Sequence, residues 1–248
     1  MRLAPPPRLG PEIVEWMDAG VGSEAEDVEA YRLLDRVNRL QSGHRATLGA
    51  LETWLSATDR PSRAISFVDV AGGDGRFADR VVDWGARRGV TIRPIVIDTN
   101  PAALAAASIP GRSADPVRAR ALALPLADGA TDVVHASCFF HHLSVDDARE
   151  GLAEMCRASR SLVIVNDLVR SRFAAVAIRA ITRLLVDNRL VRHDGPISVL
   201  KAFTPDELLS IAHAATPTAP DGWRWRIGTA FPYRMALVGA RIGTGRRG

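Results

Sequence analysis

The sequence is poor in the residues and runs that would cross-link the chain or anchor it in a membrane. Its two cysteines, Cys138 and Cys156, exclude a disulfide-rich scaffold and a cysteine-rich zinc site. No stretch reaches the roughly 18 uncharged apolar residues that a membrane span needs. The first ten residues hold three prolines and lack the apolar core of a signal peptide. These absences predict a cytoplasmic protein with reduced thiols.

Lysine is nearly absent, because Lys201 is the only one and the other 31 basic residues are arginine. Against 28 acidic residues this gives a formal net charge of +4. Acidic and basic residues are interleaved rather than gathered in separate segments, so we attribute the arginine excess to GC-rich codon usage. No nucleic-acid partner is therefore expected.

The apolar pattern predicts an α/β chain with an N-terminal addition. Residues 1–62 are expected to form a disordered tail over 1–10 and then helices over 11–18 and 24–55, with a break near Ser42-Gly43. From residue 63 onward, short β-branched runs alternate with helical spacing, which indicates a doubly wound parallel sheet. Strands are expected at 65–70, 92–97, 117–122, 132–137, 161–165, 223–227 and 235–242, and helices at 76–88, 101–107, 145–157, 170–188 and from Thr204 onward.

The most informative stretch is the glycine turn at residues 71–75, between the first expected strand and a helix. The N-terminus of such a helix leaves backbone N–H groups unpaired, and glycine lets a ligand approach them closely. The next strand ends at Asp98, 23 residues after Gly75, where a carboxylate can accept hydrogen bonds from both hydroxyls of a ribose. The pattern predicts a cofactor that contains a nucleoside.

Two cofactor classes fit this turn. The spacing Gly73-x-Gly75-x-x-Ala78 meets the loose dinucleotide fingerprint, whereas S-adenosylmethionine needs the ribose carboxylate but no pyrophosphate cradle. Asp69 favours the second class, because a carboxylate before the turn repels a pyrophosphate and attracts an amino group. Its alternative role is to cap the turn. The chain also has no Tyr-x-x-x-Lys pair, which disfavours an NAD-dependent oxidoreductase.

Residues 68–75 resemble the strand, aspartate and glycine turn of the class I S-adenosylmethionine-dependent methyltransferases, with Ala71 where the family often has glycine. Residues 124–134 are similar to the family's stretch before the fourth strand, and 141–143 to the His-His-Leu that follows it. The resemblance spans 65–242. It implies a Rossmann-like, doubly wound sheet of seven strands with a closing antiparallel hairpin.

The resemblance implies S-adenosyl-L-methionine as the cofactor. Asp69 would face its amino group and Asp98 its ribose. Arg120 stands where many family members have an aspartate for the adenine, so backbone groups are expected to replace that contact. The predicted cofactor-binding residues are Asp69, Ala71, Gly72, Gly73, Gly75, Asp98, Thr99, Ala121, Leu122 and Ser137.

A hydroxyl acceptor must also lose its proton to a nearby base. His193 and Asp194 are expected in a loop after the long helix, His141 and His142 follow the fourth strand, and Asn166 and Asp167 end the fifth. The catalytic candidates are His193, Asp194, His142 and Asn166, each with a structural role as the alternative. No metal site is expected, because His141 and His142 lack partners at ligand spacing.

Residues 168–200 are expected to form a helical insertion that covers the acceptor together with residues 1–62; a core helix or a lipid-touching helix are the alternatives. Segments 165–171 and 191–204 resemble bacterial enzymes that methylate phenolic polyketide products, which implies O-methylation of a small molecule. C-methylation of a quinone-like ring and a non-catalytic binding module remain open. No stable membrane insertion is expected, and a homodimer is left open.

Overall fold

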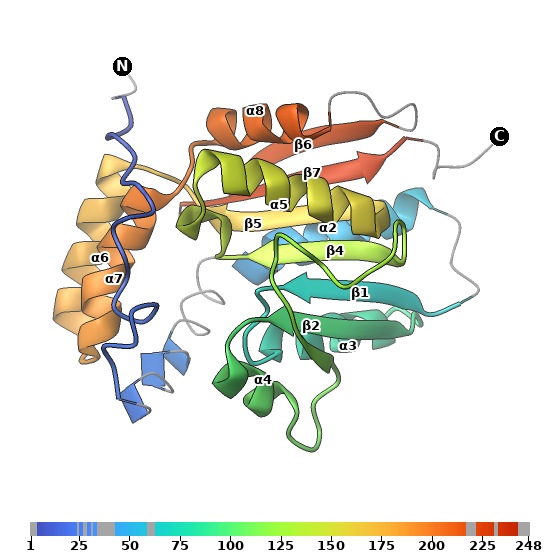
Figure 1. Ribbon diagram of the computed structural model, residues 1–248, viewed down its shortest axis with the longest axis horizontal. Coiled ribbons are helices and arrows are strands. Elements are labelled where there is room, and N and C mark those ends of the chain that lie inside the picture. Colours follow the sequence, from blue (N-terminus) through green and yellow to red (C-terminus); the bar gives the residue numbers. More distant parts are fainter. Residues whose placement is uncertain are drawn as a thin grey trace.

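The sheet of this computed structural model has seven strands in the order β3-β2-β1-β4-β5-β7-β6 (Figure 1). The structure describes residues 4–23, 25–26, 29–30, 32–33, 43–58, 63–216, 222–230 and 233–242. The strands are β1 (Ile65–Val70), β2 (Ile92–Asp98), β3 (Asp115–Arg118), β4 (Thr131–Ser137), β5 (Ser159–Leu168), β6 (Trp223–Ala230) and β7 (Arg234–Arg241). The helices are α2 (Gly43–Ala57), α3 (Arg76–Ala86), α4 (Pro101–Ala107), the short 3-10 helix η1 (Phe140–His142), α5 (Val145–Ala158), α6 (Arg172–Leu185), α7 (Arg189–Lys201) and α8 (Pro205–Ala215).

Strands β1 to β5 run parallel, and β7 pairs antiparallel with both β5 and β6. The predicted doubly wound sheet with a closing antiparallel hairpin is therefore confirmed. The parallel register sets Asp69 beside Val96 on β2 and His135 on β4. Because parallel strands end at a common edge, the glycine turn, Asp98 and the residues after β4 and β5 gather there.

Two apolar layers hold the sheet between its helices. Phe67 and Val68 are adjacent on β1 and fully buried, but they belong to different clusters because successive strand residues face opposite sides. The Phe67 cluster packs α2 and α3, and the Val68 cluster packs α5 and α8. The central strands are buried on both faces, which is why they read as continuous apolar runs.

The expected helix caps are present. Asn100 accepts hydrogen bonds from the backbone N–H of Ala102 and Ala103 at the start of α4. Thr204 and Glu207 form a reciprocal capping box at α8. Both helix starts were predictable from sequence, because each cap is a hydrogen bond between residues close together in the chain.

The N-terminal predictions were wrong where the structure describes the chain. Residues 4–10 are ordered against the core: Leu9 N donates to Leu200 O at 3.1 Å, and Arg8 donates to the carbonyl oxygens of Lys201 and Leu143, each at 2.6 Å. Residues 11–18 form turns instead of a helix. Tertiary partners on α7 and after β4 take up groups that a helix would have paired within itself. The helix predicted over 24–42 lies largely outside the described residues.

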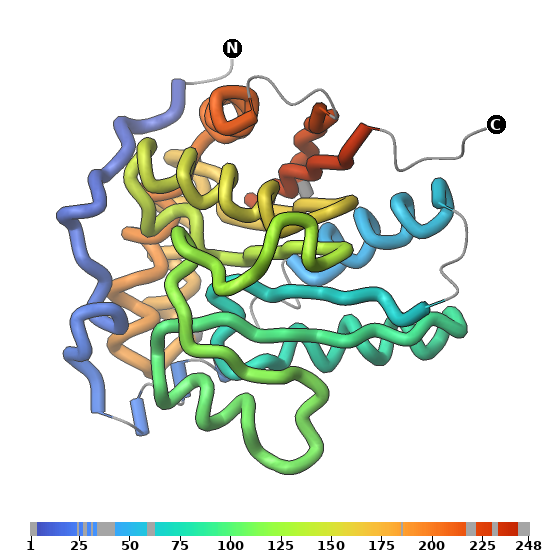
Figure 2. Tube along the Cα trace, turned by 45° about the vertical axis from the view of Figure 1, so that its right-hand side comes forward, coloured from blue at the N-terminus to red at the C-terminus, as the bar shows by residue number. Residues whose placement is uncertain are grey.

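The segment after β5 forms two helices instead of the single predicted one. Helix α6 ends at Leu185, and the Asn188 side chain starts α7 by accepting from Leu190 N and Val191 N. His193 and Asp194 therefore lie on a helix, and their predicted loop is wrong. Figure 1 and Figure 2 both show the N-terminal segment (residues 4–23) alongside the α6–α7 pair at one end of the sheet. Within the described chain, no helix has the length and apolarity to cross a membrane.

Candidate functional site

Two cavities lie at the carboxyl edge of the parallel strands, with volumes of about 390 Å³ and 170 Å³. Ala71 lines both, so the glycine turn separates two neighbouring compartments. The smaller one is lined by Ala71, Ile97, Asp98, Thr99, Ala119, Arg120, Ala121, Leu122 and Phe139. The larger one is lined by the turn, the residues after β4, both helices α6 and α7, and the N-terminal segment.

The backbone of the glycine turn is bent into the left-handed region at three residues: Ala71 (φ 53°), Gly73 (φ 58°) and Gly75 (φ 75°). This conformation suits glycine, so the Ala71 backbone is strained. Gly72 is required for a different reason, since an added Cβ would lie 2.9 Å from Asp69 Cγ. Gly75 is the N-cap residue of α3 and lines neither cavity.

Asp69 is 2% exposed and ends a buried chain of polar side chains. Asn166 Nδ2 donates to Thr47 Oγ1 at 3.0 Å, Thr47 Oγ1 lies 3.1 Å from His135 Nε2, and His135 Nδ1 lies 2.7 Å from Asp69 Oδ1. Because the Thr47 hydroxyl accepts from Asn166, it can donate to His135, whose other nitrogen then donates to Asp69. Sequence reasoning missed His135 and Thr47, whose partners are distant in the chain.

Asn166 is buried at the far end of this chain and also donates to the carbonyl oxygen of Gly43. It lines neither cavity. The structure therefore places this predicted catalytic residue in a bridge between β5 and the start of α2.

Asp98 and four of the other predicted residues line the smaller cavity, namely Ala71, Thr99, Ala121 and Leu122. Asp98 Oδ2 accepts from Gly73 N and Oδ1 from Asn100 N, both at 2.9 Å. Each carboxylate oxygen keeps a lone pair for a hydroxyl donor. Thr99, Ala121 and Leu122 line the same cavity, and Phe139 adds an apolar ring. This compartment suits a ribose with an attached flat base.

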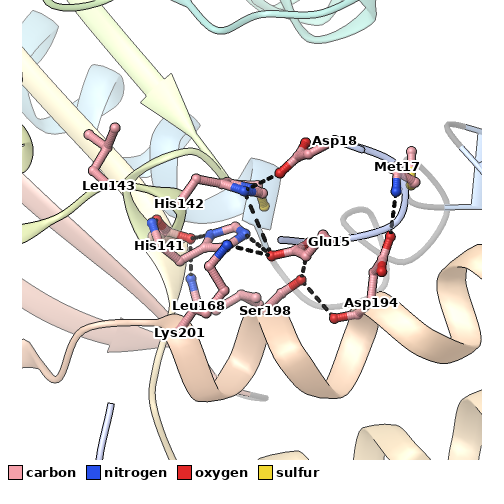
Figure 3. Close-up of polar contacts among 12 residues, drawn as sticks. Glu15, Met17, Asp18, His141, His142, Leu143, Leu168, Asp194, Ser198 and Lys201 are labelled. Atoms are coloured by element: carbon pink, nitrogen blue, oxygen red, sulfur yellow. Dashed lines mark hydrogen bonds and ion pairs between the residues drawn. The ribbon is translucent and has the colours of Figure 1, made fainter. Parts of the chain in front are cut away.

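The larger cavity is mostly apolar along α6 and α7. The apolar side chains that line it are Met17, Phe77, Leu168, Ala174, Ala177, Ile178, Ile181, Val191 and Val199. Asp69 and Gly72 line it at the glycine turn, and Ser137 lines it at the end of β4. Its other polar groups include a cluster built from the N-terminal segment and η1, which is shown in Figure 3.

We define the histidine cluster as Glu15, Asp18, His141 and His142. Glu15 Oε1 lies 3.7 Å from His142 Nδ1 and 4.0 Å from His141 Nε2, and Asp18 Oδ2 lies 2.8 Å from His142 Nδ1 (Figure 3). Burial alone would lower the pKa of His142, but the carboxylates of Asp18 and Glu15 outweigh it and raise that pKa. In return, the contact with His142 lowers the pKa of Asp18 against the opposing effect of burial.

His141 is held by Asp167 at the end of β5. Its Nδ1 lies 2.7 Å from Asp167 Oδ1, and its backbone N–H donates to Asp167 Oδ2 at 2.9 Å. Asp167 is 1% exposed, and burial would raise its pKa; the charge and hydrogen bond of His141 outweigh this, so the pKa is lowered. The pair fixes the orientation of the His141 ring beside the cavity.

His193 and Asp194 hold the N-terminal segment in place. His193 stacks on Trp16 with ring centroids 3.8 Å apart, and it does not line either cavity. Asp194 lines the larger cavity, but its carboxylate accepts from Trp16 N at 2.8 Å and Met17 N at 3.0 Å. The structure thus brings His142 and Asp194 to the larger cavity and leaves His193 and Asn166 outside it.

Comparison with known proteins gives a family match and a fold match. Residues 67–161 match the family model described as a methyltransferase domain, which includes the glycine turn and the paired histidines. No curated protein sequence matches the chain.

Similar solved structures include the plantazolicin methyltransferase BpumL in complex with a monoazolic desmethylPZN analogue and SAH, at 12% identity and a TM-score of 0.62 over 87% of this chain and 91% of that one. LepI in complex with SAM has 16% identity and a TM-score of 0.54, over 77% of this chain and 46% of LepI. A possible histamine N-methyltransferase from Thermotoga maritima has 16% identity and a TM-score of 0.51, over 85% and 97%. At these identities the likeness is one of fold.

Proposed function

This chain carries a methyltransferase domain with the class I S-adenosylmethionine-dependent fold, and on that premise we propose that it O-methylates a small molecule bearing an aromatic hydroxyl group. The observation that carries the proposal is the larger cavity. It joins the glycine turn to the histidine cluster through a mostly apolar wall, and about 390 Å³ is a size typical of small-ligand sites.

The cofactor fits the residues around the turn. The smaller cavity would take the adenosine, with the Asp98 carboxylate on its ribose hydroxyls, and Asp69 would attract the amino group of the methionine part. S-adenosylmethionine supplies a methyl group on a positively charged sulfur, which leaves as a neutral thioether when an acceptor oxygen takes the methyl. The protein itself supplies alignment and exclusion of water.

The acceptor hydroxyl must lose its proton, and the histidine cluster is where the cavity offers a base. We assign this task to His142 and His141, which both line the cavity. Asp167 fixes the His141 ring as a positioning residue, in the manner of a carboxylate behind a catalytic histidine. For Asn166, Asp194 and His193 we propose positioning roles. Asp194 and His193 hold the N-terminal segment in the cavity wall, and Asn166 belongs to the hydrogen-bond chain that ends at Asp69.

The N-terminal segment and the α6–α7 pair are proposed to cover the acceptor. Ala177 and Ile178 line the cavity, while Phe173 and Val176 on the same helix are exposed. Filling the cavity at Ala177→Trp should raise KM for the acceptor without changing the dissociation constant for the cofactor. Ala180→Trp on the exposed side of α6 is the matched control and should leave both unchanged.

The test of the proposal has two stages. Titration calorimetry should find binding of S-adenosylmethionine and S-adenosylhomocysteine but not of NAD. Incubation with phenols and S-adenosylmethionine carrying a labelled methyl group should then give a methyl ether, identified by mass spectrometry and NMR. Binding without any transfer, or a methyl group found on ring carbon, would overturn the O-methylation proposal.

A further inference from the structure

We infer that the histidine cluster is a binding site for one divalent transition-metal ion, with Glu15, His141 and His142 as ligands. The binding itself does not depend on the proposed methyl transfer. Only its chemical role rests on that function.

The distances among the ligand atoms carry this inference. One ligand atom from each of Glu15, His141 and His142 lies within 4.8 Å of the other two. Glu15 Oε1 stands 3.7 and 4.0 Å from the two imidazole nitrogens. Ligands at about 2.0–2.2 Å from a tetrahedral zinc ion are about 3.4 Å apart, so closure around an ion shortens the Glu15–histidine distances by about 0.3 and 0.6 Å and the distance between the two histidine ligand atoms by at most about 1.4 Å.

Glu15 supplies an independent observation. The residue is 6% exposed, and its buried Oε1 atom accepts no hydrogen bond from any residue that the structure describes. Its other oxygen is fixed by the Ser198 hydroxyl at 2.7 Å, which turns Oε1 toward the histidines (Figure 3). The Lys201 ammonium, 3.5 Å away, offsets part of the charge on Oε1, but the oxygen accepts no hydrogen bond from the described residues, so its lone pairs are available to a metal ion.

The surrounding residues are those of a metal site. His141 places its second ring nitrogen 2.7 Å from the buried Asp167 carboxylate, the carboxylate–histidine pairing that orients metal-bound imidazoles. Lys201 Nζ lies 3.5 Å from Glu15 Oε1, so one ammonium stands beside the two carboxylates of Glu15 and Asp18. The net negative charge favours a cation, and two imidazoles favour zinc over manganese, magnesium or calcium.

The position of this site also suggests what the ion does. The three ligands line the larger cavity, so an ion held by them would face the acceptor. A divalent cation lowers the pKa of a hydroxyl group that it contacts, so that the O–H bond releases its proton to water and keeps its electron pair on oxygen. The ion would thereby perform the activation that the proposed function otherwise assigns to the histidines.

Calorimetry on the full chain, stripped with EDTA and dialysed, tests the inference directly. Zinc chloride should bind at one ion per chain, manganese chloride should bind more weakly, and magnesium chloride should give no heat of binding. Glu15→Gln and His142→Gln should each weaken zinc binding by about tenfold or more. The matched controls Glu12→Gln, in the same segment, and His213→Gln, on α8, are both exposed and should bind like wild type.

Unfolding of a variant is checked by circular dichroism, and Ser198→Ala offers a milder change that frees Glu15 without removing a ligand. Wild-type zinc affinity in both Glu15→Gln and Ser198→Ala would overturn the inference, as would a wild-type chain that binds no zinc. Full methyl transfer by the stripped enzyme would overturn the role of the ion while the proposed function stands. Zinc binding without methyl transfer to any phenol would uphold the site and sink the proposed function.

Discussion

At the scale of single residues, the site depends on a few side chains whose surroundings give them their properties. Asp69 on β1 is a buried carboxylate at the end of a hydrogen-bond chain that runs through β5, α2 and β4, rather than an isolated acid at a turn. Gly72 is required by its contact with that carboxylate, and Ala71 carries the left-handed backbone that a glycine would adopt more easily. The glycine turn therefore packs so closely against Asp69 that it leaves no room for a side chain at position 72.

Replacing Asp69 with Asn tests its role toward the cofactor. The variant keeps the shape and loses the charge, so the dissociation constant for S-adenosylmethionine should rise by roughly 10- to 100-fold, the value of a charge-assisted hydrogen bond. Titration calorimetry measures it. Asp83→Asn, at an exposed position on α3, is the control and should bind the cofactor like wild type.

Two glycine substitutions should have opposite effects. Gly72→Ala forces a Cβ to within 3.0 Å of the Asp69 side chain and carbonyl, so cofactor affinity and melting temperature should both fall. Gly49→Ala, in the interior of α2 with no atom within 4 Å of the new Cβ, should raise the free energy of unfolding by about 0.5–1 kcal/mol. Equal melting temperatures for the two variants would contradict this account of the turn.

At the scale of elements, the cavity wall is held together by contacts between segments far apart in the chain. The N-terminal segment has no regular helix in its described residues 4–23, and its turns are fixed by α7 and η1. Asp194 is central because one carboxylate accepts two consecutive backbone N–H groups of that segment. An element without its own hydrogen-bond ladder depends on such partners for its conformation.

Asp194→Asn should therefore loosen the N-terminal segment. One amide oxygen can replace only part of the carboxylate's bonding, so limited proteolysis should cut residues 4–23 faster, and KM for the acceptor should rise more than the cofactor dissociation constant. Asp187→Asn, fully exposed just before α7, is the matched control. Unchanged proteolysis in Asp194→Asn would argue that the segment is held mainly by Arg8.

At the scale of the whole molecule, two cavities lie at the carboxyl ends of the parallel strands, and polar and charged side chains join the strands at their amino ends. There, Asp132 at the start of β4 is buried and accepts from Ser66 N and Ser66 Oγ, both at 2.9 Å, and from Arg63. Burial would raise its pKa, but the Arg63 and Ser66 contacts outweigh that effect and lower it. The carboxylate thus joins β1 and β4 most strongly when ionised.

This linkage gives the fold a pH dependence. A folded-state pKa below the unfolded value, about 3.8, means that the contribution of Asp132 is complete above that pH and is lost as the pH falls through the folded value. Asp132→Asn should cost about 1–3 kcal/mol of unfolding free energy at pH 7, because Arg63 and Ser66 lose a buried, charged acceptor. Urea denaturation should show this difference shrinking below pH 4, and a constant difference would contradict the assignment.

The sequence by itself determined the α/β alternation, the strand–turn–helix at residues 65–86, and the cofactor edge with Asp69 and Asp98. These features follow from local periodicity and from the parallel connections that bring the strand ends together. Only the tertiary structure decided which side chains meet. Glu15 lies beside His141 and His142, more than 120 residues away in the chain. Asp194 accepts hydrogen bonds from the N-terminal backbone, and Asn166 donates to Thr47 instead of lining the cavity. Such partnerships depend on how whole elements pack, and no short stretch of sequence encodes them.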